Sequence, residues 1–137
     1  MKKICCYLAG AMDNVSLSEM SNWRNEVKEH FKQDERFFFY DPCRRPHGTN
    51  LTPREIMLLD LKDIDNSDLI LVDNRDLGKS TFGTPCEVFY ASYIQNKPVL
   101  AWNDKETSRR GIFQKALFTH EFKSLEEALN HISEYYF

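Results

Sequence analysis

One short apolar run constrains the fold of this chain more than any other feature. Residues 69–72 (LILV) are consecutively apolar, and turn-forming residues precede them. Such a run is typical of a strand that is buried on both faces of a sheet. A helical pattern precedes the run, while a loop with two glycines, a second helical pattern and another apolar run follow it. This order predicts a βαβ unit of a parallel sheet with an entry helix.

The loop at residues 73–83 is the first candidate for a ligand site. It contains Gly78 and Gly83, and it leaves the carboxyl end of the predicted strand, where open α/β sheets bind their ligands. Two carboxylates are expected near this loop. Asp60 belongs to the helix before the strand, and Glu87 to the helix after the loop.

The remaining elements alternate in the same way along the chain. Apolar runs predict further strands, and amphipathic patterns with capping boxes predict the helices between them. We therefore expect one domain over residues 1–137, an α/β three-layer sandwich whose sheet has about five parallel strands in a flavodoxin-like or Rossmann-like arrangement. The expected strands cover residues 4–9, 37–40, 69–72, 99–102 and 117–122, and the expected helices begin near residues 17, 53, 84, 112 and 125.

Composition excludes several functional classes. The chain is 42% hydrophobic and 28% charged, with a net charge of −3, which is ordinary for a soluble globular protein. It has no basic stripe to bind nucleic acid, no apolar run of membrane-spanning length and no signal-peptide core. The cysteines and histidines lack metal-ligand spacing, so we expect no metal and no cofactor. Reduced thiols and a cytoplasmic location are expected for the four cysteines at positions 5, 6, 43 and 86.

Asp60 lies among apolar positions of its predicted helix. Ile56, Leu59 and Ile64 form the expected buried stripe, and Asp60 is four residues from both Ile56 and Ile64. A carboxylate on such a stripe needs a partner or a function. Two aspartates nearer the helix end are expected to be surface charges or turn formers: Asp63 and Asp65.

Glu87 has a structural and a catalytic interpretation. Residues 84–87 (TPCE) fit a capping box, as residues 52–55 (TPRE) do, and the spacing does not decide between cap and catalyst. The positive end of the helix is expected to keep Glu87 ionised at neutral pH, and an ionised carboxylate facing a pocket is a nucleophile. Glu87 and Asp60 together would suffice for displacement at a glycosidic bond, one as nucleophile and one as proton donor or relay.

Four further residues are candidates for the site. Tyr7, in the first strand, is either a core aromatic residue or a hydroxyl near the carboxyl end of the strand. Gly10 follows that strand and would let a ligand approach the backbone closely. Arg44 and Arg45 lie in a polar loop and could contact a phosphate or a base, although solvated side chains are the expectation for at least one of them.

Three sequence blocks resemble the nucleoside 2-deoxyribosyltransferase family. They stand in the family's order and cover most of the chain. The glutamate block is the more specific, and the first block is weak by itself. The blocks are residues 7–10 (YLAG), Asp60 with residues 68–70 (DLI), and residues 83–91 (GTPCEVFYA) with 97–99 (KPV).

The resemblance implies an activity and roles for three residues. Glu87 would be the nucleophile that forms a deoxyribosyl-enzyme, Tyr7 would position it, and Asp60 would assist at the base. The enzyme would cleave the N-glycosidic bond of a 2′-deoxyribonucleoside and transfer the sugar to another nucleobase, as a homo-oligomer whose sites a neighbouring subunit completes. The loop ending at Gly83 would hold the sugar or a 5′-phosphate.

One position departs from the transferase pattern. Family transferases carry an aspartate six residues before the nucleophile, and this chain has Thr81 there. The related deoxynucleoside 5′-monophosphate N-glycosidases have a serine at that position, where it contacts the phosphate, so a threonine hydroxyl could do the same. Those hydrolases also carry a Ser-x-Arg-Gly segment after the first strand, whereas residues 11–14 here are AMDN. Hydrolysis of a deoxynucleoside 5′-monophosphate is therefore the alternative activity.

Other functional classes fit less well. A non-catalytic nucleotide-binding domain would keep the glycine loop but would not need Asp60 on an apolar stripe. A phosphoacceptor receiver domain would want acidic residues after the first strand and an aspartate ending the third, which Asp13 and Asp73 supply only loosely, and Lys97 precedes its strand rather than ending it. A dinucleotide oxidoreductase is disfavoured because the chain has no G-x-G-x-x-G.

Overall fold

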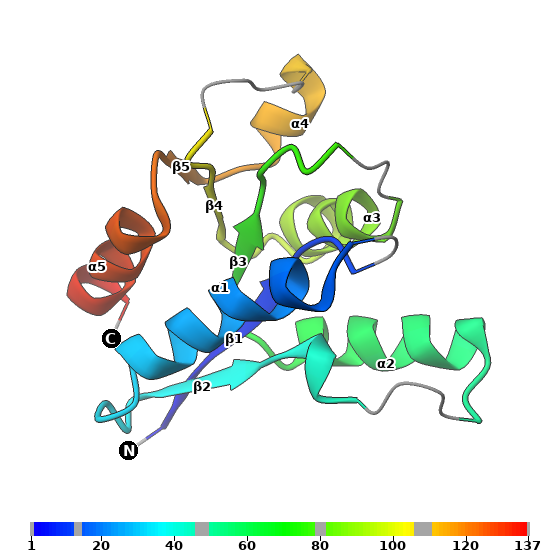
Figure 1. Cartoon of the computed structure of the whole chain (residues 1–137), viewed down its shortest axis with the longest axis horizontal. Helices are drawn as coiled ribbons and strands as arrows, with labels where there is room; N and C mark the ends of the chain where they lie inside the picture. Colours follow the sequence, from blue (N-terminus) through cyan, green and yellow to red (C-terminus); the bar gives the residue numbers. More distant parts are fainter. Residues whose placement is uncertain (1, 13–14, 46–49, 79–81, 106–110, 137) are drawn as a thin grey trace.

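The computed structural model describes residues 2–12, 15–45, 50–78, 82–105 and 111–136 and contains a five-stranded sheet (Figure 1). Every neighbouring pair of strands is parallel. The strand order β2-β1-β3-β4-β5 is the flavodoxin-like order. The predicted parallel α/β architecture is confirmed. The strands are β1 (Ile4–Ala9), β2 (Phe37–Tyr40), β3 (Leu69–Asp73), β4 (Val99–Trp102) and β5 (His120–Phe122).

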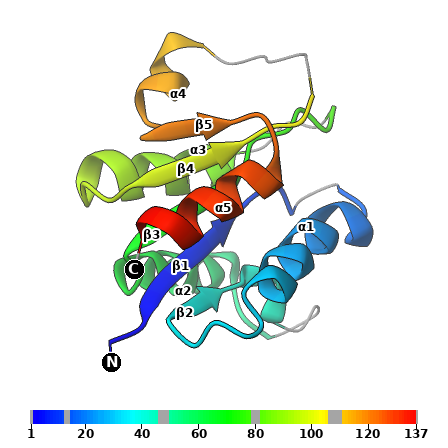
Figure 2. The same cartoon turned by 90° about the vertical axis from the view of Figure 1, so that its left-hand side faces the viewer.

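Helices cover both faces of the sheet, as the two perpendicular views show (Figures 1 and 2). The helices α1 and α5 pack on one face, and α2 and α3 lie on the other. The short helix α4 lies beyond the β5 edge, and a single 3-10 turn follows β2. The helices are α1 (Leu17–His30), η1 (Pro42–Arg44), α2 (Pro53–Asp65), α3 (Gly83–Phe89), α4 (Ile112–Ala116) and α5 (Leu125–Tyr135), and α3 continues as a π-helical turn, η2 (Tyr90–Ile94).

Two predicted capping boxes form as expected. The Ser16 hydroxyl accepts a hydrogen bond from the backbone N–H of Glu19, and the Glu19 carboxylate accepts one from the N–H of Ser16. Thr52 and Glu55 make the same reciprocal pair at the start of α2. These contacts satisfy donors that the first turn of a helix leaves unpaired, so both helices begin where the sequence predicts.

The alternation of side chains along β1 divides the core in two. Cys6 and Leu8 point to the face that α1 and α5 cover, while Tyr7 and Ala9 point to the face of α2 and α3. All four side chains are fully buried. The predicted stripes of α1 and α5 are confirmed, because each of their members is buried: Met20, Trp23, Val27, Phe31, Leu125, Ala128, Leu129 and Ile132.

The predicted stripe of α2 is wrong in its first half. Ile64 is fully buried, but Ile56 and Leu59 are 40% and 36% exposed. Met57 and Leu58 between them are also exposed, so this whole turn of the helix lies outside the core. The apolar residues here are consecutive, and consecutive residues point around the helix rather than along one face, so the pattern alone could not assign a buried side.

Two predicted boundaries also shift. Helix α3 begins at Gly83 rather than at Thr84, its N-cap residue is Phe82, and no side chain caps it. Strand β5 is shorter than residues 117–122, since Leu117 is the C-cap residue of α4 and strand pairing starts at His120.

Within the described residues, the helices are too short or too polar to cross a membrane.

Candidate active site

The hydroxyl of Tyr7 donates a short hydrogen bond to the Glu87 carboxylate. Tyr7 lies two residues before the end of β1, which pairs with β2 and β3, and Glu87 lies on α3 above the same face of the sheet. The Tyr7 ring is fully buried in the core, and its hydroxyl reaches the Glu87 carboxylate. Burial, with the nearby charges of Glu87 and Asp60, raises the pKa of the Tyr7 phenol, so it stays protonated and acts as a donor.

Glu87 is not a helix cap. It is the fifth residue of α3, and its side chain bonds to Tyr7 rather than back to a backbone N–H of the first turn. The expectation that it is ionised throughout the neutral range is also corrected. Burial raises the pKa of Glu87 to about 7, the Tyr7 hydrogen bond opposes that rise, and the charge of Asp60 adds to it. Burial therefore works against the ionised form of Glu87 at neutral pH.

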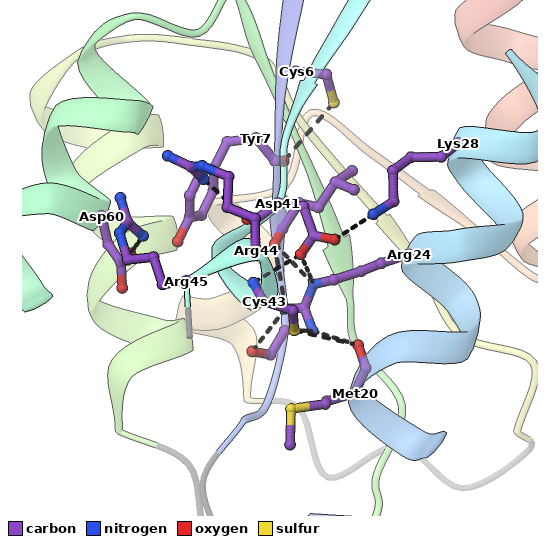
Figure 3. A network of polar contacts seen from close by, with 12 residues as sticks. Cys6, Tyr7, Met20, Arg24, Lys28, Asp41, Cys43, Arg44, Arg45 and Asp60 are labelled. Atoms are coloured by element: carbon purple, nitrogen blue, oxygen red, sulfur yellow. Dashed lines mark hydrogen bonds and ion pairs between the residues drawn. The ribbon is translucent and has the colours of Figure 1, made fainter. Parts of the chain in front are cut away.

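Asp60 has a partner that the sequence did not predict. Its Oδ1 atom accepts a hydrogen bond of 2.5 Å from a guanidinium nitrogen of Arg45 (Figure 3). Burial raises the pKa of Asp60, and the Arg45 charge works against that rise. Asp60 also lies close enough to Glu87 and Tyr7 for its charge to raise the pKa of both. The structure thus brings Tyr7, Glu87 and Asp60 together, as expected for one site.

Arg44 and Arg45 both form ion pairs with α2. Each donates to the Oδ2 atom of Asp63, Arg44 at 2.7 Å and Arg45 at 2.9 Å. Arg44 also donates to the carbonyl oxygen of Asp41 and lies over the Tyr40 ring. Neither arginine is therefore simply solvated. The expectation that Asp63 is a surface charge is wrong, because it is buried between the two guanidinium groups.

A fully buried arginine supports the end of β1. Arg24 of α1 donates to the backbone carbonyl oxygens of Leu8, Gly10 and Met20, and it lies 3.7 Å from the Asp41 carboxylate (Figure 3). Its charge lowers the pKa of Glu87. A buried guanidinium with this many acceptors is satisfied, so it fixes the backbone that carries Tyr7.

Gly10 is needed for packing inside the protein. A Cβ atom at this position would lie 3.0 Å from the Trp23 ring, 3.2 Å from the Cβ atom of Asp73 and 3.3 Å from the Arg24 guanidinium. The space that a side chain would occupy is therefore filled by the protein. Around Gly83 there is no such crowding among the described residues, since none of them has an atom within 4 Å of the place that a Cβ atom would take. Contact of either glycine with a ligand stays a prediction.

Part of the predicted site falls outside the described residues. Thr81 is the predicted site residue that lies there. The described residues include no group of histidine, cysteine, aspartate and glutamate side chains arranged to hold a metal ion. All four cysteines are free thiols, as the sequence analysis expects.

Sequence reasoning missed Arg24 and the pairing of Arg45 with Asp60. A signal for Arg24 was present, because it stands four residues after Met20 on the buried stripe of α1. A cation on a buried stripe, like the carboxylate of Asp60, needs a partner or a function. The sequence around Arg45 does not indicate its role, because its partners Asp60 and Asp63 lie 15 and 18 residues away on another element.

Comparison with known proteins gives structural matches alone. No family model matches this sequence, and no curated protein matches it either. Solved structures do resemble it over nearly the whole chain. A conserved protein from Enterococcus faecalis V583 has a TM-score of 0.74 and 16% identity, over 96% of this chain and 98% of that one.

Two of the similar structures are 2-deoxyribosyltransferases. The protein from Bacillus psychrosaccharolyticus has a TM-score of 0.71 and 20% identity, over 92% of this chain and 90% of its own. The protein from Leishmania mexicana has a TM-score of 0.75 and 17% identity, over 98% of this chain and 99% of its own. At these identities the likeness is one of fold. The chain has the fold of the nucleoside 2-deoxyribosyltransferases.

Proposed function

We propose that this chain cleaves the N-glycosidic bond of a 2′-deoxyribonucleoside and transfers the sugar to another nucleobase through a covalent intermediate on Glu87. The observation that carries the proposal is the hydrogen bond from Tyr7 to Glu87 beside the Asp60 carboxylate. This arrangement supplies a nucleophile, a donor that orients it and a second carboxyl group. The shared fold with 2-deoxyribosyltransferases supports the same activity.

In the first half of the reaction, an ionised Glu87 oxygen attacks C1′ of the deoxyribose. The new C1′–O bond forms as the C1′–N bond breaks, and the departing base takes the bonding electron pair and a proton from Asp60. In the second half, a nitrogen of the incoming base attacks C1′, its proton returns to Asp60, and Glu87 leaves as a carboxylate. No cofactor enters this sequence of steps.

The pKa values of the two carboxyl groups suit these roles. Burial raises the pKa of Glu87 to about 7, so an ionised fraction is present at neutral pH. Burial also raises the pKa of Asp60, which favours the protonated form that a proton donor needs. The charge of Asp60 also raises the pKa of Glu87, so a proton on Asp60 favours the ionised form of Glu87.

A mechanism-based inhibitor tests the nucleophile directly. A 2′-fluoro-arabinosyl nucleoside, in which fluorine slows hydrolysis of the intermediate, should leave a mass adduct on the peptide that contains Glu87. Glu87→Ala should abolish both the adduct and the release of base while the chain stays folded. An adduct on another residue, or turnover by Glu87→Ala, would overturn the assignment.

The substrate form and the acceptor are tested with a panel of donors. Deoxynucleosides and their 5′-monophosphates are incubated with and without a second base, and products are separated by chromatography. Exchange of bases supports transfer, whereas release of free base from monophosphates alone supports the N-glycosidase alternative.

We propose that Gly10, Gly83, Arg44 and Thr81 contact the substrate, and that Thr81 sets the preference between the two forms. An unchanged preference in Thr81→Asp would contradict that role.

We also propose that the chain forms a homo-oligomer. The exposed apolar turn of α2, residues 56–59, supports this because four large apolar side chains in one turn are costly to leave in water. Leu59 directly precedes Asp60, so a second copy covering this turn would lie beside the site. Light scattering of the purified chain gives the oligomeric mass, and a monomer at micromolar concentration would contradict this proposal.

A further inference from the structure

Arg45 binds two carboxylate groups of α2, those of Asp60 and Asp63. One of its guanidinium nitrogens donates to Asp60 at 2.5 Å and another donates to Asp63 at 2.9 Å. The two carboxylates are three residues apart on α2, so they form one acceptor face for the planar guanidinium. The Arg45 side chain is 18% exposed and that of Asp60 is 20% exposed, so water screens this pair only partly.

Arg44 provides a natural comparison. It shares Asp63 with Arg45, but its other bond goes to the carbonyl oxygen of Asp41, and its side chain is 43% exposed. The structure therefore contains two neighbouring arginines that both bind Asp63, of which one also hydrogen-bonds to Asp60.

The proposed reaction moves a negative charge across this site. Before the first step the charge lies on Glu87, and after it Glu87 is a neutral ester while Asp60 has lost its proton to the base. The charge thus moves away from Tyr7 and toward Arg45. A cation fixed beside the place where charge develops stabilises the transition state more than the ground state, because its benefit grows as the charge arrives.

We propose that Arg45 is a positioning residue that holds Asp60 in place and stabilises the charge that Asp60 acquires when it protonates the departing base. This inference rests on the proposed function. In the second half of the reaction the same contact keeps Asp60 ionised, ready to take the proton of the incoming base. Asp63 holds the other side of the guanidinium and keeps it turned toward Asp60.

The other groups facing Glu87 come from three elements. Tyr7 of β1 donates to it, Arg24 of α1 lowers its pKa, and Asp60 of α2 raises it. Arg45 also lowers the pKa of Glu87. Removing the Arg45 charge should therefore raise the pKa of both Asp60 and Glu87. If Arg45 only supported the fold, its replacement would not raise these two pKa values selectively.

The test compares Arg45→Gln, Arg45→Lys and Arg44→Gln, with Arg36→Gln as the control. Arg36 pairs with Asp34 at the opposite end of β2, so it undergoes the same chemical change away from the site. Circular dichroism and a thermal melt first show that each variant folds.

Arg45→Gln should lower kcat by about 100-fold with little change in KM, and Arg45→Lys should recover part of the loss. Arg44→Gln should act mainly on KM, because the Arg44 hydrogen bonds go to Asp41 and Asp63, and only its charge acts on Asp60.

A second measurement does not depend on turnover. Carbon-13 NMR titration of the Asp60 and Glu87 carboxyl carbons, assigned with Asp60→Asn and Glu87→Gln, should give higher pKa values for both groups in Arg45→Gln than in the wild type and Arg36→Gln. Unchanged pKa values, or equal losses of kcat in Arg44→Gln and Arg45→Gln, would overturn the role of Arg45 in an active enzyme. A wild-type chain that releases no base from any donor would instead overturn the proposed function, and this role with it.

Discussion

The Tyr7 hydroxyl donates its hydrogen bond to Glu87, a residue 80 positions later in the chain. The bond joins the central part of the sheet to α3. Burial raises the pKa of the Tyr7 phenol, so the hydroxyl is a hydrogen-bond donor at neutral pH. It therefore favours the ionised form of Glu87 and partly offsets the effect of burial on that carboxyl group.

Replacing Tyr7 by phenylalanine should raise the pKa of Glu87 and slow the reaction. A hydrogen bond to a charged group is worth about 1.5–3 kcal/mol, so kcat/KM at pH 7 should fall by roughly 10–100-fold. The acid limb of the pH profile should move upward. Tyr135→Phe is the control, because Tyr135 lies exposed on α5. A Tyr7→Phe enzyme with the pH profile of the wild type would contradict this role.

The activity of the wild type should rise with pH through about 7, the pKa of Glu87. Below that value kcat/KM should fall by about tenfold for each pH unit, because the protonated carboxyl group cannot attack C1′. The measurement is initial rate against pH at low substrate concentration. A profile that is flat between pH 5 and pH 8 would rule out Glu87 as a nucleophile with this pKa.

The same shift makes Glu87 a pH-dependent contributor to stability. Its pKa is raised from 4.5 to about 7 on folding, so the folded state binds more protons between these values. The stabilisation is present below about pH 4.5 and is lost as the pH rises through 7. Relative to Glu87→Gln, the wild type should lose on the order of 2 kcal/mol of unfolding free energy between pH 5 and pH 8, allowing for partial exposure of the side chain. Urea unfolding at the two pH values measures this difference, and equal differences at both would contradict it.

Asp60→Asn keeps the size of the side chain and removes its proton transfer. We expect turnover to fall by about 10²–10⁴-fold. The loss should be smaller for donors whose base leaves easily, since such bases need less help from an acid. Rates for a series of donors, plotted against the pKa of the leaving base, test this directly, and an equal loss for every donor would argue against proton donation.

Gly10→Ala should destabilise the protein because the added Cβ atom would meet Trp23 at 3.0 Å and Arg24 at 3.3 Å. Both neighbours are buried, so neither can move freely, and the expected loss is about 1–3 kcal/mol. Gly83→Ala is the matched control, since no atom of the residues that the structure describes lies within 4 Å of a Cβ atom at Gly83. Thermal unfolding of the two variants separates crowding from a general effect of adding a methyl group.

The α/β sandwich was predictable because its signals are local. The run at residues 69–72 is apolar on both faces, which a strand in the middle of a covered parallel sheet requires. Ser16 and Thr52 marked helix starts by the hydroxyl and glutamate spacing of a capping box. The sequence indicated Asp60 by its place among apolar residues of a helix, but it indicated Tyr7 and Glu87 mainly through resemblance, since spacing alone left these two with structural alternatives.

The tertiary structure decided what each of these groups contacts. Glu87 does not cap its helix, because α3 starts at Gly83 and the Glu87 carboxylate accepts a hydrogen bond from Tyr7 of β1. Its raised pKa depends on burial by distant segments, and the partner of Asp60 comes from the chain after η1. Sequence patterns report local propensity and periodicity. Charge, burial and hydrogen bonding between segments far apart in the chain arise only when the sheet brings those segments together.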